Sequence, residues 1–230
     1  MKTLGQYLAG ALAAAGVRHV FGIPGVHNLE LYRGLEGTSL RHITGRHEQG
    51  LGFMADGYAR VSGRPGVCFT ISGPGLSNIA TALGQAYGDS IPLLVISSQN
   101  RRGEAGSGRG FLHELPDQRA LARAVTAASF AIEDPGELPA ALAQAYAIFA
   151  AARPRPVYIE IPLDVLAADA SGLALPAVFC RAPWPMRRGS RRRRGCCAAP
   201  GAPSSWPAAG QSGPRRNCAV WSNTSAHRSS

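Results

Sequence analysis

The sequence GVCFTISGPGLSN at residues 66–78 decides the fold of this chain. Gly66 to Ile71 has the apolar composition of a strand, Gly73-Pro74-Gly75 marks a turn, and helical spacing follows from Leu76 to Tyr87. The next run, Ile91 to Ser97, is apolar, as expected for a strand that is buried on both faces. A strand, a helix and a second strand in this order predict a βαβ unit with parallel strands.

The same alternation extends in both directions from this unit. Strands are expected at residues 17–21, 40–43, 125–132 and 157–161, and helices at residues 3–15, 28–35, 47–61, 116–123 and 137–151. We therefore predict an α/β fold, a parallel sheet of about six strands with helices on both faces. Ligands of such sheets bind beyond the carboxyl ends of the strands, which directs attention to residues 22–27, 44–48, 72–78 and 98–115.

The charge of the chain is unevenly distributed. The net charge is +10, but residues 1–178 contain 14 Lys and Arg and 14 Asp and Glu, so 10 of the 24 basic residues and no acidic residue follow. All three Trp and four of the five Cys also lie after residue 179. Because the basic excess is confined to this part, it does not indicate nucleic-acid binding as a property of the fold.

Other function classes are disfavoured by missing patterns. No apolar run of about 18 residues predicts a membrane span, and the first residues do not resemble a secretory signal, so we expect a cytoplasmic protein. Gly106, Gly108 and Gly110 lack the strand and helix context of a dinucleotide-binding loop. The cysteines show no spacing suited to zinc, and Cys68 is expected to be a small core residue.

Three turns stand where the predicted strands end: VFGIPG at 20–25, RHEQG at 46–50 and ISGPGLSN at 71–78. In order and spacing they resemble the N-terminal, pyrimidine-binding domain of thiamin-diphosphate enzymes of the acetolactate synthase, benzoylformate decarboxylase and pyruvate oxidase group. The resemblance covers residues 1–175. It implies the thiamin-diphosphate-binding fold, thiamin diphosphate as cofactor and a 2-oxo acid as substrate, acted on by decarboxylation or carboligation.

Glu48 is the principal candidate for catalysis. A carboxylate at the start of a helix can accept a strong hydrogen bond from a heterocycle nitrogen. By resemblance, Glu48 would bind N1′ of the cofactor aminopyrimidine and so promote removal of the thiazolium C2 proton. The alternative is a capping or helix-dipole role.

The resemblance also assigns the cofactor-binding residues. Pro24, Gly25 and Val26 match the loop that approaches the pyrimidine ring, Pro74 belongs to a turn that lets the backbone come close to a flat ring, and Asn78 can donate a hydrogen bond near it. Taken alone, a Pro-Gly or Gly-Pro-Gly sequence is also compatible with a plain structural turn.

The loop RGFLHELPDQ at 109–118 bears on specificity. Acetolactate synthases usually carry Phe-Gln-Glu here, whereas this chain has Leu112-His113-Glu114. His113 is therefore a second catalytic candidate, since an imidazole at this place could move protons; the alternative is a surface histidine. The loop looks more like that of family members which decarboxylate larger 2-oxo acids, including guanidino 2-oxo acids.

The remainder of the family pattern is not found. The Gly-Asp-Gly motif with which a third domain of these enzymes holds Mg²⁺ and the diphosphate does not occur. We expect a pyrimidine-binding domain at 1–175, inactive alone, followed at 176–230 by a disordered tail, rich in Arg, Pro, Gly and Ser, that is the product of a frameshift. The parent would be a homodimer or homotetramer with no nucleic-acid or membrane partner. The alternative is a non-enzymatic dimerising module, or a subunit of a split enzyme.

Overall fold

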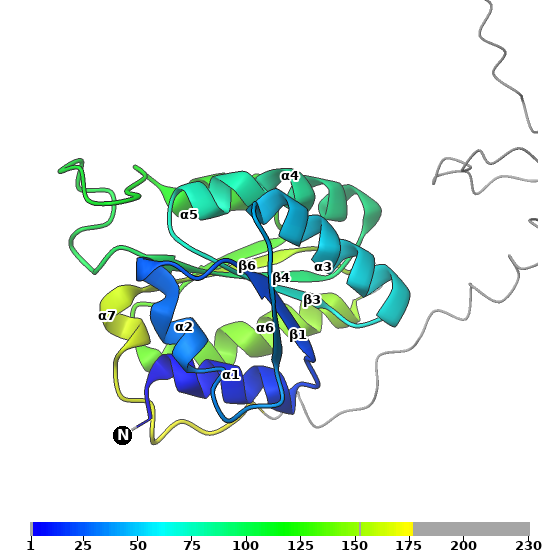
Figure 1. Cartoon of the computed structure of the whole chain (residues 1–230), viewed down its shortest axis with the longest axis horizontal. Helices are drawn as coiled ribbons and strands as arrows, with labels where there is room; N and C mark the ends of the chain where they lie inside the picture. The colour runs from blue at the N-terminus through cyan, green and yellow to red at the C-terminus, as the bar shows by residue number, and fades with distance from the viewer. Residues whose placement is uncertain (1, 152, 177–230) are drawn as a thin grey trace, which may run out of the picture. The chain divides into compact units, whose positions relative to one another are not determined.

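A computed structural model describes residues 2–151 and 153–176 of the chain (Figure 1). The predicted disordered tail and its origin in a frameshift concern residues that, apart from Pro176, lie outside the described part.

Six strands form one parallel sheet in the order β2-β1-β3-β4-β6-β5, which confirms the predicted fold class. The strands are β1 His19–Gly22, β2 Arg41–Thr44, β3 Gly66–Thr70, β4 Leu93–Gln99, β5 Ala128–Ala131 and β6 Val157–Pro162. The chain passes from β1 outward to β2 on one side, then returns to β3 on the other side of β1. The loops after β1 and β3 therefore diverge, and a ligand crevice is expected between them.

Helices cover both faces of the sheet, as predicted (Figure 1). The α-helices are α1 Leu4–Ala14, α2 Leu29–Arg33, α3 Glu48–Ser62, α4 Pro74–Asp89, α5 Gln118–Arg123, α6 Leu138–Ala150 and α7 Leu163–Leu166, and short 3₁₀ helices occupy η1 Val26–Asn28 and η2 Pro135–Glu137. Figure 1 shows α3, α4 and α5 on one face and α1, α2 and α6 on the other. None of these helices in the described residues is long and apolar enough to span a membrane.

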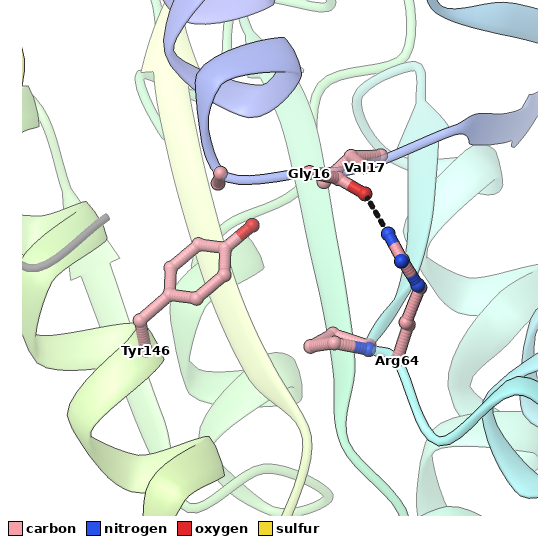
Figure 2. A pocket seen from close by; sticks show the side chains of 6 residues that line it. Gly16, Val17, Arg64 and Tyr146 are labelled. Atoms are coloured by element: carbon pink, nitrogen blue, oxygen red, sulfur yellow. Dashed lines mark hydrogen bonds between the residues drawn. The ribbon is translucent and has the colours of Figure 1, made fainter. Parts of the chain in front are cut away.

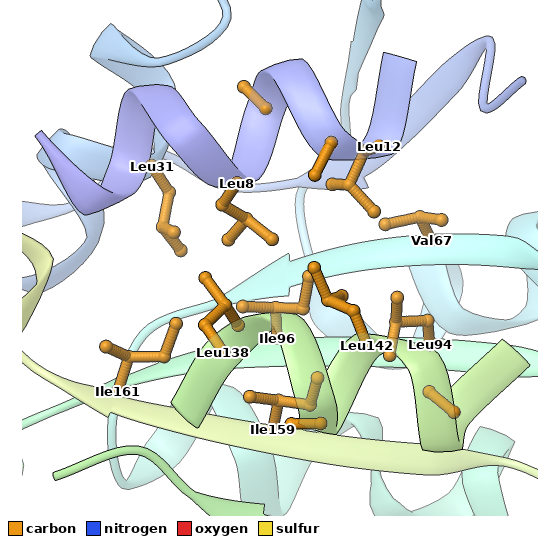
Figure 3. Close-up of a cluster of buried hydrophobic side chains, with 14 of the residues drawn as sticks. Leu8, Leu12, Leu31, Val67, Leu94, Ile96, Leu138, Leu142, Ile159 and Ile161 are labelled. Atoms are coloured by element: carbon orange, nitrogen blue, oxygen red, sulfur yellow. The ribbon is translucent and has the colours of Figure 1, made fainter. Parts of the chain in front are cut away.

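Each face of the sheet has its own apolar core. Under α1, α2 and α6, side chains from the helices meet those of β3, β4 and β6, with Leu8, Leu12, Leu142 and Ile96 fully buried (Figure 3). Under α3 and α4, Cys68 packs among Leu76, Ile79 and Leu83, so its predicted place in the core is confirmed.

Several element boundaries differ from the sequence-based expectation. Helix α4 begins at Pro74 rather than Leu76, because proline at the first helical position has no N–H to leave unpaired. The predicted helix 28–35 is divided into η1 and α2, and the predicted strand 125–132 is reduced to the four residues of β5. Helix α7 was not predicted. Residues 100–115 contain no helix or strand, as expected, but the helix predicted from residue 116 begins only at Gln118.

Candidate active site

Glu48 is the first residue of α3, and it lies where the chain turns back from β2 into the molecule. Its side chain is only 8% exposed. Asn78 on α4 donates a hydrogen bond from Nδ2 to Oε2 of Glu48 at 2.9 Å. In the described residues the other oxygen, Oε1, has no hydrogen-bond partner. The structure thus unites two predicted site residues and leaves one carboxylate oxygen free to accept from a ligand.

Close packing of α3 on α4 makes this pairing possible. A Cβ atom on Gly52 would lie 2.6 Å from Cβ of Ala82 and 2.8 Å from Cγ1 of Ile79. No real side chain tolerates such distances, so glycine is required for the two helices to approach. The approach in turn brings the first turns of both helices, and with them Glu48 and Asn78, to the same place.

The turn after β1 carries Pro24, Gly25 and Val26 and is held by one buried side chain. Asn28 accepts from the backbone N–H of Gly25 at 2.8 Å and donates to the carbonyl of Ile23 at 3.1 Å. Pro24 is exposed, and Val26 is 72% exposed. In the described residues no hydrogen bond joins this turn to Glu48. The three predicted residues lie at the same edge of the sheet as Glu48, and their side chains offer no polar group.

Asn28 is a residue that sequence reasoning missed. The signal was available, because a polar side chain at the third position of a helix can accept from the N–H of the N-cap residue, here Gly25.

The turn after β3 meets the long loop at a single crowded point. Gly73 has a φ of +59° and a ψ of −105°, which a residue with a side chain rarely adopts. A Cβ atom there would lie 2.3 Å from the carbonyl oxygen of His113. Pro74, the next residue, is exposed. The glycine therefore allows the loop that carries His113 to close over the start of α4.

His113 is half-buried, and its φ of +58° lies in the left-handed region. The loop around it is fastened by Glu114. That carboxylate accepts hydrogen bonds from Ser107 Oγ and from the backbone N–H groups of Gly108, Gly110 and Phe111 at 2.7 to 3.1 Å. Desolvation opposes ionisation, but these donors outweigh it and lower the pKa of Glu114. The hydrogen bonds to Glu114 thus order the loop and place His113 beside Gly73.

A buried polar network lies below this loop, and sequence reasoning missed it. Gln118 accepts from the N–H of Gly73 at 2.7 Å and donates to Tyr158 Oη at 2.7 Å and to the carbonyl of Ser98 at 3.2 Å. Tyr158 donates to Glu160 at 3.3 Å. Burial raises the pKa of Glu160, while Gln118 acts to lower it. The network ties β4 and β6 to the turn that begins α4.

Two cavities lie at opposite edges of the sheet. Near the carboxyl ends, about 200 Å³ is enclosed by residues that include Asn100, Arg102 and Glu160. Near the amino ends, Arg64 donates from Nη1 to the carbonyl of Gly16 at 2.7 Å beside a cavity of about 10 Å³ (Figure 2). The second space holds about one water molecule and no cofactor.

The arrangement can bind a flat, nitrogen-containing ring. It offers a carboxylate oxygen without a partner at a helix N-terminus, an adjacent amide, close-packed glycine turns and a histidine on an ordered loop. Carboxylate acceptors in such places form strong hydrogen bonds to N–H donors and stabilise positive charge on them.

Comparison with known proteins agrees with this geometry. Residues 2–121 match the family model of the thiamine pyrophosphate enzyme, N-terminal TPP binding domain; thiamine pyrophosphate is another name for thiamin diphosphate. The chain is 63% identical over 166 residues to a protein of Pseudomonas aeruginosa named as a probable 2-ketoarginine decarboxylase, covering 72% of this chain and 30% of the relative.

Acetolactate synthases are more distant relatives. The enzyme of Arthrospira platensis is 40% identical over 162 residues, covering 69% of this chain and 28% of the relative. The large subunit of isozyme 1 of Escherichia coli is 38% identical over 161 residues, covering 70% of this chain and 28% of the relative. The chain thus spans less than a third of the length of these relatives.

Proposed function

Because the chain belongs to the thiamine pyrophosphate enzymes and carries their N-terminal TPP binding domain, we propose that it acts in the decarboxylation of a 2-oxo acid. In this proposal Glu48 is the residue that binds and activates the aminopyrimidine of the cofactor. When bound, thiamin diphosphate supplies the electron sink into which the carbon–carboxylate bond can break.

The free oxygen of Glu48 carries the proposal. Asn78 holds Oε2 and fixes the plane of the carboxylate, so Oε1 is available to accept from a ring nitrogen. The residues present fit such a ring: the Glu48 side chain is only 8% exposed, and its free oxygen is not occupied by another group of the described residues. Pro24, Gly25, Val26 and Pro74 would line the ring by van der Waals contact, since they offer no side-chain polar group.

A guanidino 2-oxo acid is the substrate class that we favour. The relative named for 2-ketoarginine is 63% identical, against 40% and 38% for the acetolactate synthases. His113 also stands where those synthases usually carry glutamine, so an ionisable group replaces a neutral amide beside the substrate. Diphosphate and Mg²⁺ would be held by a domain corresponding to the rest of the longer relatives, since the chain has no Gly-Asp-Gly motif.

A chimeric enzyme tests the proposal. Residues 2–176 would replace the matching segment of the Pseudomonas relative, and turnover would be measured with thiamin diphosphate and Mg²⁺ on 2-ketoarginine and on pyruvate. Cofactor-dependent release of CO₂ from 2-ketoarginine is expected, with acetolactate formation from pyruvate much slower. A folded chimera that binds the cofactor but prefers pyruvate would refute the substrate class. One that fails to bind the cofactor would refute the proposed function.

The parent enzyme would assemble from identical copies. Helix α3 presents Phe53, Met54 and Val61 to solvent, with Val61 87% exposed, and nothing lies within 4 Å of a Cβ placed on Gly50 or Gly57. These positions share one side of the helix and would let a second helix approach closely. We infer that a second copy covers this side. Met54→Glu should convert a dimer into a monomer in light scattering of the 230-residue chain, whereas Thr81→Glu on α4 should not.

A further inference from the structure

His27, which the mechanism proposed above does not use, is built into the candidate site. It lies in η1 directly after the Pro24-Gly25 turn and is 6% exposed. Its Nδ1 is 2.7 Å from Oγ of Ser72, a fully buried residue two positions after the end of β3. This hydroxyl–imidazole bond bridges the two loops that diverge at the switch in strand order, and in either tautomer it fixes the orientation of the ring.

The ring of His113 rests on this anchored ring. The two centroids are 5.2 Å apart and the planes meet at 87°, an edge-to-face contact. Nδ1 of His113 is buried and has no hydrogen-bond partner in the described residues. The imidazole of His113 is therefore oriented by packing against His27 and not by a hydrogen bond of its own.

The backbone of His113 is constrained at the same place. The crowding of its carbonyl against Gly73 leaves no room for a shift toward α4, and Asn100 donates from Nδ2 to the carbonyl of Leu112 at 3.0 Å. A left-handed φ in a residue other than glycine costs free energy and persists only where its surroundings impose it. Such imposed conformations are characteristic of functional sites.

The surroundings of His27 change the pKa of its ring. Burial lowers the pKa of His27, the imidazole of His113 lowers it further, and Glu104 acts in the opposite sense. These are the ionisable groups in the described residues that act on His27. The lowered pKa favours the neutral form of His27 near pH 7.

We propose that His27, anchored to Ser72, is a positioning residue that holds the imidazole of His113 toward the substrate. Its catalytic consequence rests on the proposed function. His113 would transfer a proton to an oxygen of the 2-oxo acid as negative charge develops there, and would recover a proton from water when the product leaves.

The first test uses the 230-residue chain with isotope-labelled histidine. In NMR spectra, Ser72→Ala and His27→Phe should both move the ring signals of His113, and Ser72→Thr should restore them. His113→Phe should raise the pKa of His27, because it removes the neighbouring imidazole that lowers it. His19→Phe is the matched control, because His19 makes a similar ring contact, at 5.3 Å, with Tyr58.

The second test uses the chimeric enzyme. Ser72→Ala should lower kcat about tenfold with little change in KM and should alter the pH profile, since it displaces a proton-transferring group without removing a binding contact. Ser72→Thr should recover most of the loss. The positioning role would be overturned if the ring signals of His113 were unchanged in a folded Ser72→Ala chain. It would also be overturned if His113→Phe left the pKa of His27 unchanged. An inactive chimera with the NMR coupling intact would instead refute the proposed function.

Discussion

Glu48 and Glu160 are two carboxylates with the same exposure, 8% each, at the same edge of the sheet. Glu48 receives one hydrogen bond, from Asn78 to Oε2, and in the described residues each of the two carboxylates keeps its Oε1 without a partner. Glu160 lies in a network with Tyr158 and Gln118 that joins two strands and continues to the turn at Gly73.

This difference separates Glu48, a candidate site residue, from Glu160, a residue that supports the fold around the site. A carboxylate bonded into a network that spans several elements helps to stabilise one arrangement of the chain, whereas a carboxylate held by a single amide contributes less to that framework. Burial alone does not distinguish the two residues. The number and origin of their hydrogen-bond donors distinguish them, because α4 brings a single amide to Glu48, while α5 and β6 both bring donors to Glu160.

The largest effect should come from Glu48→Gln in the chimeric enzyme. An amide can keep the bond to Asn78 but cannot stabilise positive charge on a ring nitrogen, so kcat should fall by roughly 10²–10⁴-fold. Glu160→Gln measured beside it should leave kcat nearly unchanged. Activity of Glu48→Gln within about threefold of the parent, a barrier change under about 0.7 kcal/mol, would remove the distinction between the two carboxylates.

Gln118→Leu should destabilise the fold most. It leaves the N–H of Gly73 without its partner and removes the donor to Tyr158 Oη, and each orphaned buried group costs about 1–3 kcal/mol. Urea unfolding of the 230-residue chain should show a loss of roughly 3 kcal/mol. Gln85→Leu, at an exposed position on α4, should stay within about 0.5 kcal/mol. Equal losses of stability in the two variants would show that the buried network contributes no more to the free energy of unfolding than an exposed side chain does.

Asn78→Ala should have a moderate effect on activity. Without the amide, the carboxylate of Glu48 is no longer oriented, so kcat/KM should fall about tenfold, equivalent to about 1.4 kcal/mol. Asn78→Asp should be worse, because it sets a second negative charge beside Glu48. The neighbouring exposed residue provides the control, Ser77→Ala, whose kcat/KM should match the parent. If Asn78→Ala also behaved like the parent, the amide would not orient Glu48.

Glu160→Gln should have a small effect that depends on pH. Since burial raises the folded-state pKa of Glu160, the folded protein binds this proton more tightly than the unfolded chain does. Its contribution to stability is complete below about pH 4.5 and is lost as the pH rises through the folded-state pKa. The variant cannot lose that proton, so it should gain stability over the parent with rising pH, on the order of 1 kcal/mol at neutrality.

Thermal unfolding at pH 4.5 and pH 7 would measure the gain, with Glu36→Gln as the exposed control. A variant that is less stable than the parent by the same amount at both values would mean that the charged form of Glu160 is not destabilising.

Much of the molecule could be predicted from local sequence. The alternation of apolar and helical patterns predicts six strands and the helices between them, and the structure confirms the parallel sheet with two covered faces. Errors include the short helix α7, which was not predicted, and the ends of elements, as at Pro74 and in β5, where tertiary contacts and caps outweigh periodicity. The turns RHEQG and ISGPGLSN placed Glu48 and Asn78 at one edge, and the structure adds that they touch.

What the sequence alone determined is the set of strands, the helices and the turns that carry the candidate residues, because periodicity and turn chemistry act over a few neighbouring positions. Only the tertiary structure decided which residues meet. His27 and Ser72 are 45 residues apart, and so are Gly73 and Gln118, yet each pair is joined by a hydrogen bond of 2.7 Å. Those contacts follow from the order of strands in the sheet and the close approach at Gly52 and Gly73, since packing in three dimensions leaves no periodic trace in the chain.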